Sequence, residues 1–242
     1  MKRKIILFAM FCTLCFSGCN YSNKSLLEKR LTNMEKYSGN PGNIDEIKEG
    51  IKKFQAEADE LVSKNEKIGI WYKILGTRYL DKKMYKNALE SFQKALEYYP
   101  ENPNLYYYVG ICAGFVSHSA LDFEGKNRKD EKLNYLKLSE EALKQALNID
   151  PNYARALYSL GVLYAFDLDN GPEAVKYLEQ YVESQKCDTD GMMVLARAYY
   201  MCSEYEKAVA MYDKIISVTK SSERKAEAEA NKKVVLDSSY GS

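Results

Sequence analysis

The stretch that decides the fold is residues 69–102, GIWYKILGTRYLDKKMYKNALESFQKALEYYPEN. Its apolar residues recur every three or four positions, which is the spacing of an amphipathic helix. Gly76 lies in this stretch, and Gly110 follows in similar surroundings 34 residues later. Self-similarity at this period is typical of stacked helix–turn–helix units. The sequence therefore predicts an all-α repeat architecture.

Residues 69–102 also resemble the tetratricopeptide repeat (TPR). Eight residues hold the spacing of the TPR consensus: Tyr72, Leu75, Gly76, Tyr79, Ala88, Phe92, Ala95 and Pro100. The resemblance implies a TPR helix–turn–helix solenoid, a fold that serves as a recognition surface. We expect about four TPR units, preceded by an N-terminal helical hairpin and closed by a C-terminal capping helix.

Following the register downstream divides the repeat region, 67–221, into four units. The second unit is longer, because Ala146 and Pro151 come 51 residues after Ala95 and Pro100, which is one period plus 17. We place a 17-residue insertion near its turn and expect both helices to be lengthened by about two turns. The long hairpin at 117–133 is either a docking arm or a structural element. The four units are 69–102, 103–153, 154–187 and 189–221.

Small residues mark the predicted helix crossings. Gly76, Gly110, Gly161 and Ala196 repeat in register, where only a small residue lets two helix backbones approach. Large apolar residues at helical spacing fill the remaining space. A single hairpin cannot bury its apolar face alone, so neighbouring units must stack.

Two further segments flank the repeats. Residues 26–66 read as a helical hairpin with the turn GNPGN, and its second helix carries an apolar row at Ile44, Ile47, Ile51, Phe54, Ala58 and Leu61. Residues 222–242 read as a mostly polar capping helix with a short tail, which suits the open end of a solenoid.

The first residues predict an export signal. Lys2, Arg3 and Lys4 precede twelve apolar residues, and the run ends in Phe16-Ser17-Gly18-Cys19. This resembles a bacterial lipoprotein signal (1–18), with Cys19 as the lipid-attachment (palmitate) residue and 19–25 as a linker. An ordinary secretory signal or a membrane anchor is the alternative. We expect a cell-envelope protein on the periplasmic, extracytoplasmic side of a membrane, and the sequence does not say whether the membrane is inner or outer.

Charge and cysteine content narrow the function further. The whole chain has a formal net charge of +1, and without the three basic residues of the signal it is −2, which argues against nucleic-acid binding. Cys12 and Cys15 belong to the signal. Cys187 and Cys202 flank one predicted helix and are too far apart to bridge, so we expect no disulfide framework.

No pattern of catalytic residues stands out. The one histidine, His118, has no partner spacing of a catalytic or metal site, and we interpret it as a polar residue on the extended helix. The acidic groups near 167–170 and 188–190 lack the ligand pattern of a calcium loop and read as helix caps. We therefore expect no enzyme activity, no cofactor and no metal site.

The TPR resemblance implies a concave groove lined by the first helix of each unit. Aromatic, methionine and arginine side chains are enriched at interface cores, and these positions carry several of them. Helical aromatic residues can equally belong to the core. The candidate groove residues are Lys73, Thr77, Tyr107, Phe115, Arg155, Tyr158, Phe166, Met193, Arg197 and Tyr200.

The sequence as a whole resembles the TPR lipoproteins of spirochaetes and other diderm bacteria. This resemblance implies a membrane-anchored scaffold or adaptor that binds a protein or peptide through its groove and long hairpin. The alternative is an accessory ligand-binding component of a TRAP-type solute transporter, in which a groove or pore holds an apolar ligand.

Overall fold

The computed structural model describes residues 44–119 and 128–240, and every regular element in them is a helix. The chain divides into two compact units, Met1–Leu61 and Val62–Ser242. The described residues of the first unit form the beginning of α2, and the second unit holds the stack of helices. None of the helices in the described ranges is both long and apolar enough to cross a membrane.

Helix α2 (Ile44–Asp81) differs from the sequence prediction. A helix was expected to end at residue 66, before the first repeat, but α2 continues through this position for 38 residues in total. Residues 61–68 contain neither proline nor glycine, so no residue of this segment forces the helix to stop. Gly69 does not break the helix either, since it allows close packing against Tyr98 and Tyr99. The other predicted helix of the hairpin, near 26–37, lies outside the described residues.

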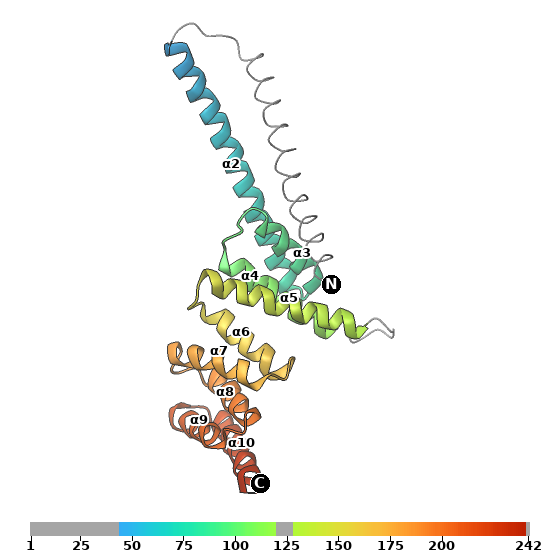
Figure 1. Ribbon diagram of the computed structural model, residues 1–242, viewed down its shortest axis with the longest axis vertical. Helices are drawn as coiled ribbons and strands as arrows, with labels where there is room; N and C mark the ends of the chain where they lie inside the picture. Colours follow the sequence, from blue (N-terminus) through green and yellow to red (C-terminus); the bar gives the residue numbers. More distant parts are fainter. Residues whose placement is uncertain (1–43, 120–127, 241–242) are drawn as a thin grey trace, which may run out of the picture. The chain divides into compact units, whose positions relative to one another are not determined.

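The remaining helices follow as antiparallel pairs along the stack (Figure 1). The final part of α2 pairs with α3 (Tyr85–Leu96), and α10 (Ser222–Tyr240) follows the last pair. The other pairs are α4 (Pro103–Ser119) with α5 (Arg128–Ile149), α6 (Ala154–Phe166) with α7 (Gly171–Ser184), and α8 (Thr189–Met201) with α9 (Tyr205–Val218). We refer to the four pairs as repeats 1 to 4.

Close helix crossings occur where the sequence predicted them. A Cβ atom added at Gly76 would lie 2.8 Å from the Phe92 ring, and one at Gly110 would lie 2.7 Å from Leu143 Cγ. Real Cβ atoms do not approach other atoms this closely, so the glycines are required for packing. Gly161 meets Leu178 in the same way in repeat 3.

Repeat 2 carries the insertion, and its described helices are longer than those of repeat 3. α4 has 17 residues against 13 in α6, and α5 has 22 against 14 in α7. His118, near the end of α4, places Nε2 3.1 Å from Asp167 Oδ1 of repeat 3. Residues 120–127 of the predicted arm lie outside the described ranges.

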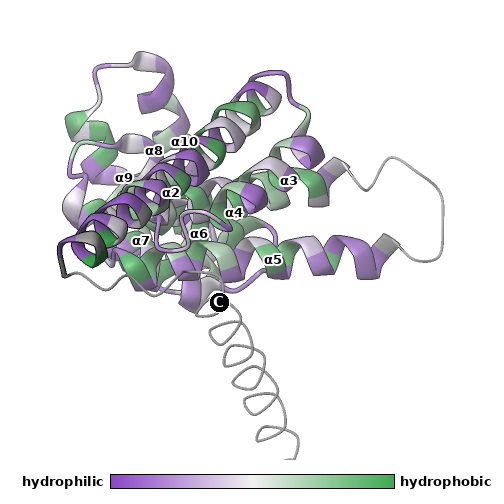
Figure 2. Ribbon diagram, turned by 90° about the horizontal axis from the view of Figure 1, so that it is seen from above, coloured by the Kyte–Doolittle hydropathy of each residue, from purple (hydrophilic) through white to green (hydrophobic). Residues whose placement is uncertain are grey.

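The core is arranged in two clusters of buried side chains along the stack. One lies around Phe92, Leu105 and Val109, in repeats 1 and 2. The other extends from Leu143 of α5 through Leu160, Leu178 and Leu195 to Ala228 and Val235 of α10. Figure 2 shows that the first turns of α5 are hydrophilic, whereas α4 and α6 are more hydrophobic. Because α10 is polar on its outer side and buries two apolar residues, it closes the stack.

Candidate partner-binding groove

A hollow lies where helices α6, α8, α9 and α10 meet, and we call it the groove. Its volume is about 320 Å³. It combines aromatic and aliphatic side chains with a few polar ones, which is the composition of many peptide and ligand sites. Its lining residues are Phe166, Met193, Val194, Arg197, Tyr200, Tyr212, Glu227, Asn231, Val234 and Val235.

Arg197 is the central charged group of the groove. Its guanidinium carbon lies 4.6 Å from the centre of the Phe166 ring, and its Nε donates a long hydrogen bond of 3.5 Å to the Ala165 carbonyl oxygen. Among the described residues, no carboxylate forms an ion pair with it. Burial raises the pKa of Tyr212, and the positive charge of Arg197 partly offsets this rise. The side chain is therefore fixed by an aromatic ring while its charge stays available to a partner.

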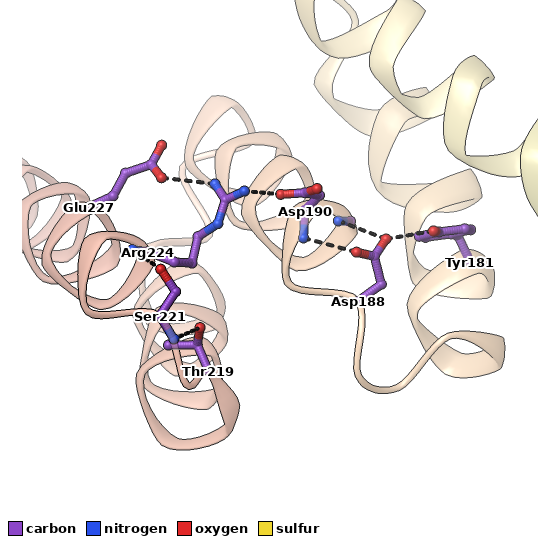
Figure 3. A network of polar contacts seen from close by, with 8 residues as sticks. Tyr181, Asp188, Asp190, Thr219, Ser221, Arg224 and Glu227 are labelled. Carbon is purple, nitrogen blue, oxygen red and sulfur yellow. Dashed lines mark hydrogen bonds and ion pairs between the residues drawn. The ribbon is translucent and has the colours of Figure 1, made fainter.

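Helix α10 supplies the last wall of the groove, and polar contacts hold it in place. Arg224 pairs with Asp190 at the start of α8 and donates a 2.8 Å hydrogen bond to Glu227 (Figure 3). The Nζ atom of Lys232 lies 2.6 Å from the Oδ1 atom of Asp213 on α9. Glu227 is the acidic residue of the groove, and its cationic partner, Arg224, lies on the same helix.

The start of α8 is fixed by Asp188. Its carboxylate accepts hydrogen bonds from the backbone N–H groups of Asp190 and Gly191, which caps the helix. It also accepts a 2.5 Å hydrogen bond from Tyr181 Oη of α7 (Figure 3). Burial, together with this bond, raises the pKa of Tyr181. The acidic group near residue 188 therefore acts as a helix cap that orders one side of the groove.

The structure places the predicted groove residues in several environments. Phe166, Met193, Arg197 and Tyr200 line the groove. Tyr158 is half-buried and packs against Tyr181, with ring centres 5.2 Å apart. It belongs to the packing of α6 against α7 within repeat 3 rather than to the lining of the groove.

Two other predicted residues meet at the start of the first helices of repeats 2 and 3. The Arg155 guanidinium lies 6.0 Å from the centre of the Tyr107 ring. Burial raises the pKa of Tyr107, and Arg155 opposes the rise. This pair resembles the Arg197–Phe166 pair in chemistry, and neither of its residues lines the groove.

The remaining predicted residues lie in repeats 1 and 2. Phe115 stacks on Tyr85 of α3, with ring centres 4.5 Å apart. Thr77 donates a hydrogen bond of 3.0 Å to the Lys73 carbonyl oxygen within α2. These three positions do not join the groove, and Cys19 lies outside the described residues.

Sequence reasoning missed the contribution of α10. Four lining residues, from Glu227 to Val235, belong to a helix that was interpreted only as a cap. A signal was present in the alternating alanines of KAEAEA, because a small residue is what each first helix uses where it crosses a neighbour. Ala228 from this run is completely buried.

Outside the groove, the described part of the chain contains three cysteine side chains. Cys112, Cys187 and Cys202 are free thiols, and burial raises the pKa of Cys112 to about 12. Within the same ranges, no three His, Cys, Asp or Glu side chains gather in a way that could hold a metal ion.

Comparisons with known proteins agree with this geometry. Residues 71–102 match the tetratricopeptide-repeat family. The chain is 26% identical over 224 residues to a TPR repeat-containing protein of Borreliella burgdorferi, covering 92% of this chain and 95% of that protein. Together with the helix pairs, these matches decide the architecture.

The described helices have the fold of a TPR solenoid.

Solved structures share the fold of this TPR solenoid. MamA from Desulfovibrio magneticus RS-1 superposes with a TM-score of 0.54 at 16% identity, over 70% of this chain and 93% of that one. YrrB, a TPR protein with an unusual peptide-binding site, superposes with a TM-score of 0.53 at 22% identity, over 75% of this chain and 88% of its own.

Proposed function

We propose that this TPR solenoid is an extracytoplasmic adaptor, held at a membrane by lipid on Cys19, that binds a peptide segment of a protein partner. The observation that carries the proposal is the groove, in which Arg197 is stacked on Phe166 and lacks an acidic partner among the described residues. Arg197 is exposed, so a partner can reach its charge without any opening of the core.

The lining of the groove defines the kind of segment that fits. Met193, Val194 and Val234 offer apolar contact, and Tyr200 offers an aromatic ring. Arg197 offers several directed donors, which suit a carboxylate or a backbone carbonyl oxygen. A segment with one large apolar side chain next to an acceptor of this kind matches both features. The peptide-binding site of YrrB supports such a use of the fold.

Binding is tested by capture from membranes with purified variants. Arg197→Ala and Tyr200→Ala should each weaken capture of the partner by about 1–2 kcal/mol, which is about 5- to 30-fold. Lys214→Ala is the matched control, because Lys214 is exposed on α9 and does not line the groove. Urea unfolding of each variant separates lost binding from lost stability. Undiminished capture by a folded Arg197→Ala/Tyr200→Ala variant would move the site elsewhere.

The membrane anchor is supported by the sequence of the leader. Basic residues, twelve apolar residues and Ser17-Gly18-Cys19 follow one another in the order of a lipoprotein signal. Metabolic labelling with a clickable fatty acid should mark the wild-type chain and not Cys19→Ser. An unlabelled wild-type chain would remove the anchor from the proposal and leave the groove untouched.

A further inference from the structure

The apolar row along α2 has the period of a coiled coil. Its members alternate between steps of four and three residues, which averages 3.5 and not the 3.6 of a straight helix. In the heptad notation abcdefg, Ile51, Ala58 and Asn65 occupy the a positions. Every d position of the row holds an apolar residue. The whole row is Ile47, Ile51, Phe54, Ala58, Leu61, Asn65 and Ile68.

The described side chains of this row are not covered. Ile47, Ile51, Leu61 and Ile68 are all exposed, and Leu61 is 63% exposed. Removing aliphatic side chains of this size from water is favourable. The heptad row on this 38-residue helix is therefore a surface suited to a partner helix, and no helix of residues 44–119 or 128–240 covers it.

The repeat register gives a second observation at the end of the row. Trp71 is 69% exposed, whereas Leu105 at the same register in repeat 2 is fully buried. Leu75 is 41% exposed, whereas its counterpart Leu160 in repeat 3 is fully buried. In repeats 2 and 3 the preceding repeat covers these positions. Repeat 1 presents the same apolar face with nothing from residues 44–119 or 128–240 over it.

The length of the row indicates what covers it. From Ile47 to Ile68 it measures about 32 Å along the helix. The apolar pattern upstream, residues 26–37, would give a helix of only about 18 Å. A helix of matching length with a matching apolar row is α2 of a second copy of this chain.

The polar residue in the row indicates the orientation of the pair. Asn65 at an a position disfavours most arrangements but can face its own counterpart in a parallel, in-register, two-stranded coiled coil. In this arrangement each residue at a g position faces a residue at an e position of the other copy. Glu57 of one copy therefore lies beside Val62 of the other, and Lys64 lies beside Gly69. No like charges are brought together at these positions.

We propose that two copies of this chain pair through α2 as a parallel, in-register coiled coil over residues 47–68, with the end of the pair shielding the face around Trp71 and Leu75. None of the groove residues belongs to α2. Each dimer then carries two grooves, and a partner with two binding segments would be held by avidity.

Cysteine cross-linking in the full chain tests the pairing with two matched substitutions. Ala58 and Ala56 are both exposed and only two residues apart, but Ala58 lies at an a position and Ala56 at the outward f position. In membranes oxidised with copper phenanthroline, Ala58→Cys should give a reducible dimer at least five-fold above Ala56→Cys, because facing a residues are within disulfide range. Two differently tagged copies should appear together in the cross-linked band.

A second measurement keeps the proposal falsifiable if the cysteine variants fold poorly. In mild detergent the wild-type chain should have the mass of two copies by light scattering, Leu61→Asp the mass of one, and Ala56→Asp the mass of two. Trp71 is the one tryptophan of the chain, so its emission should shift to longer wavelength in Leu61→Asp.

Two results would overturn the proposal. A wild-type monomer with equal cross-linking of the two cysteine variants would exclude the second copy as the occupant. If the wild-type chain is a monomer and Leu61→Asp does not change the Trp71 emission, the second copy is excluded, and residues 26–37 or another protein would be the partner of the apolar row. Either outcome leaves the proposed groove standing, because capture at Arg197 is measured separately.

Discussion

Repeat 1 and repeat 3 have the same helix–turn–helix plan but differ in how they are covered. Repeat 1 matches the TPR consensus best, yet Leu75 and Trp71 of its first helix are exposed. Repeat 3 is a looser match, yet it packs between repeats 2 and 4 and buries Leu160 and Leu163. Consensus residues therefore specify the local hairpin, while neighbouring repeats supply the burial.

The largest expected effect comes from comparing equivalent leucines in these two repeats. Leu160→Ala should lower the free energy of unfolding by about 2–5 kcal/mol, because it leaves a cavity in a closed core. In the Leu61→Asp background, where the α2 pair is absent, Leu75→Ala should lower it by less than about 1 kcal/mol, since the side chain is 41% exposed in one chain. Urea unfolding of the two variants measures both values. Equal losses would mean that repeat 1 is covered as fully as repeat 3.

A helix crossing should tolerate added volume less well than the open part of α2. Gly110→Leu should destabilise the chain by about 1–3 kcal/mol or more, because even its Cβ meets Leu143. The melting temperature should fall accordingly, while the total helix content by circular dichroism in native conditions should remain that of the wild type. An unchanged melting temperature would contradict the crossing described for repeat 2.

A smaller effect is expected for a polar group shared by repeats 2 and 3. Tyr164 donates a 2.6 Å hydrogen bond to Glu140 on α5, and burial together with this bond raises the pKa of Tyr164 to about 12. In the unfolded chain this tyrosine ionises near pH 10. The stabilisation of the folded state by neutral Tyr164 is therefore fully present below pH 10, and it is lost as the pH rises toward about 12.

Tyr164→Phe isolates this contribution. The variant should lose about 1 kcal/mol at neutral pH, and its stability should decline less steeply than that of the wild type between pH 10 and 12. Tyr205→Phe is a control, since Tyr205 is half-buried and its described contacts do not include a carboxylate. Parallel alkaline profiles for wild type and Tyr164→Phe would contradict the assignment.

The smallest effect concerns the exposed half of α2. A Cβ added at Gly50 would meet nothing within 4 Å. Gly50→Ala should therefore raise the helical stability of this segment by about 0.5–1 kcal/mol, because alanine loses less backbone entropy than glycine. Hydrogen exchange of the amides around residue 50 should slow, and those in repeat 3 should not change.

The sequence predicted the repeat plan because the plan depends on residues that have few alternatives. Gly76 and Gly110 are needed at crossings, and the 34-residue period follows from the length of one hairpin. The helical hairpin was expected to end at residue 66, but α2 continues through this position. No residue between 61 and 68 forces a helix either to stop or to continue. Such a choice depends on tertiary packing, which a local pattern does not encode.

The candidate groove was less predictable than the fold. Arg197 and Phe166 could be identified from their register, but their stacking depends on the distance between two helices. Tyr158 has the same register logic and instead packs against Tyr181, because the neighbouring second helix offers a ring at that height. The wall formed by α10 was missed because its polar composition hides the two buried residues, Ala228 and Val235.

Helix α5 has a consequence for the order in which the chain folds. Its Ala142 belongs to the core of repeats 1 and 2, while Leu143 and Ala146, on the adjoining side, belong to the core that continues to α10. In a chain of nearest-neighbour interactions, an element shared by two cores couples them. Once α4 and α5 have paired, structure can propagate from them toward both ends, and neither core can open completely without loosening α5. We therefore expect the two cores, which share α5, to unfold in a single transition.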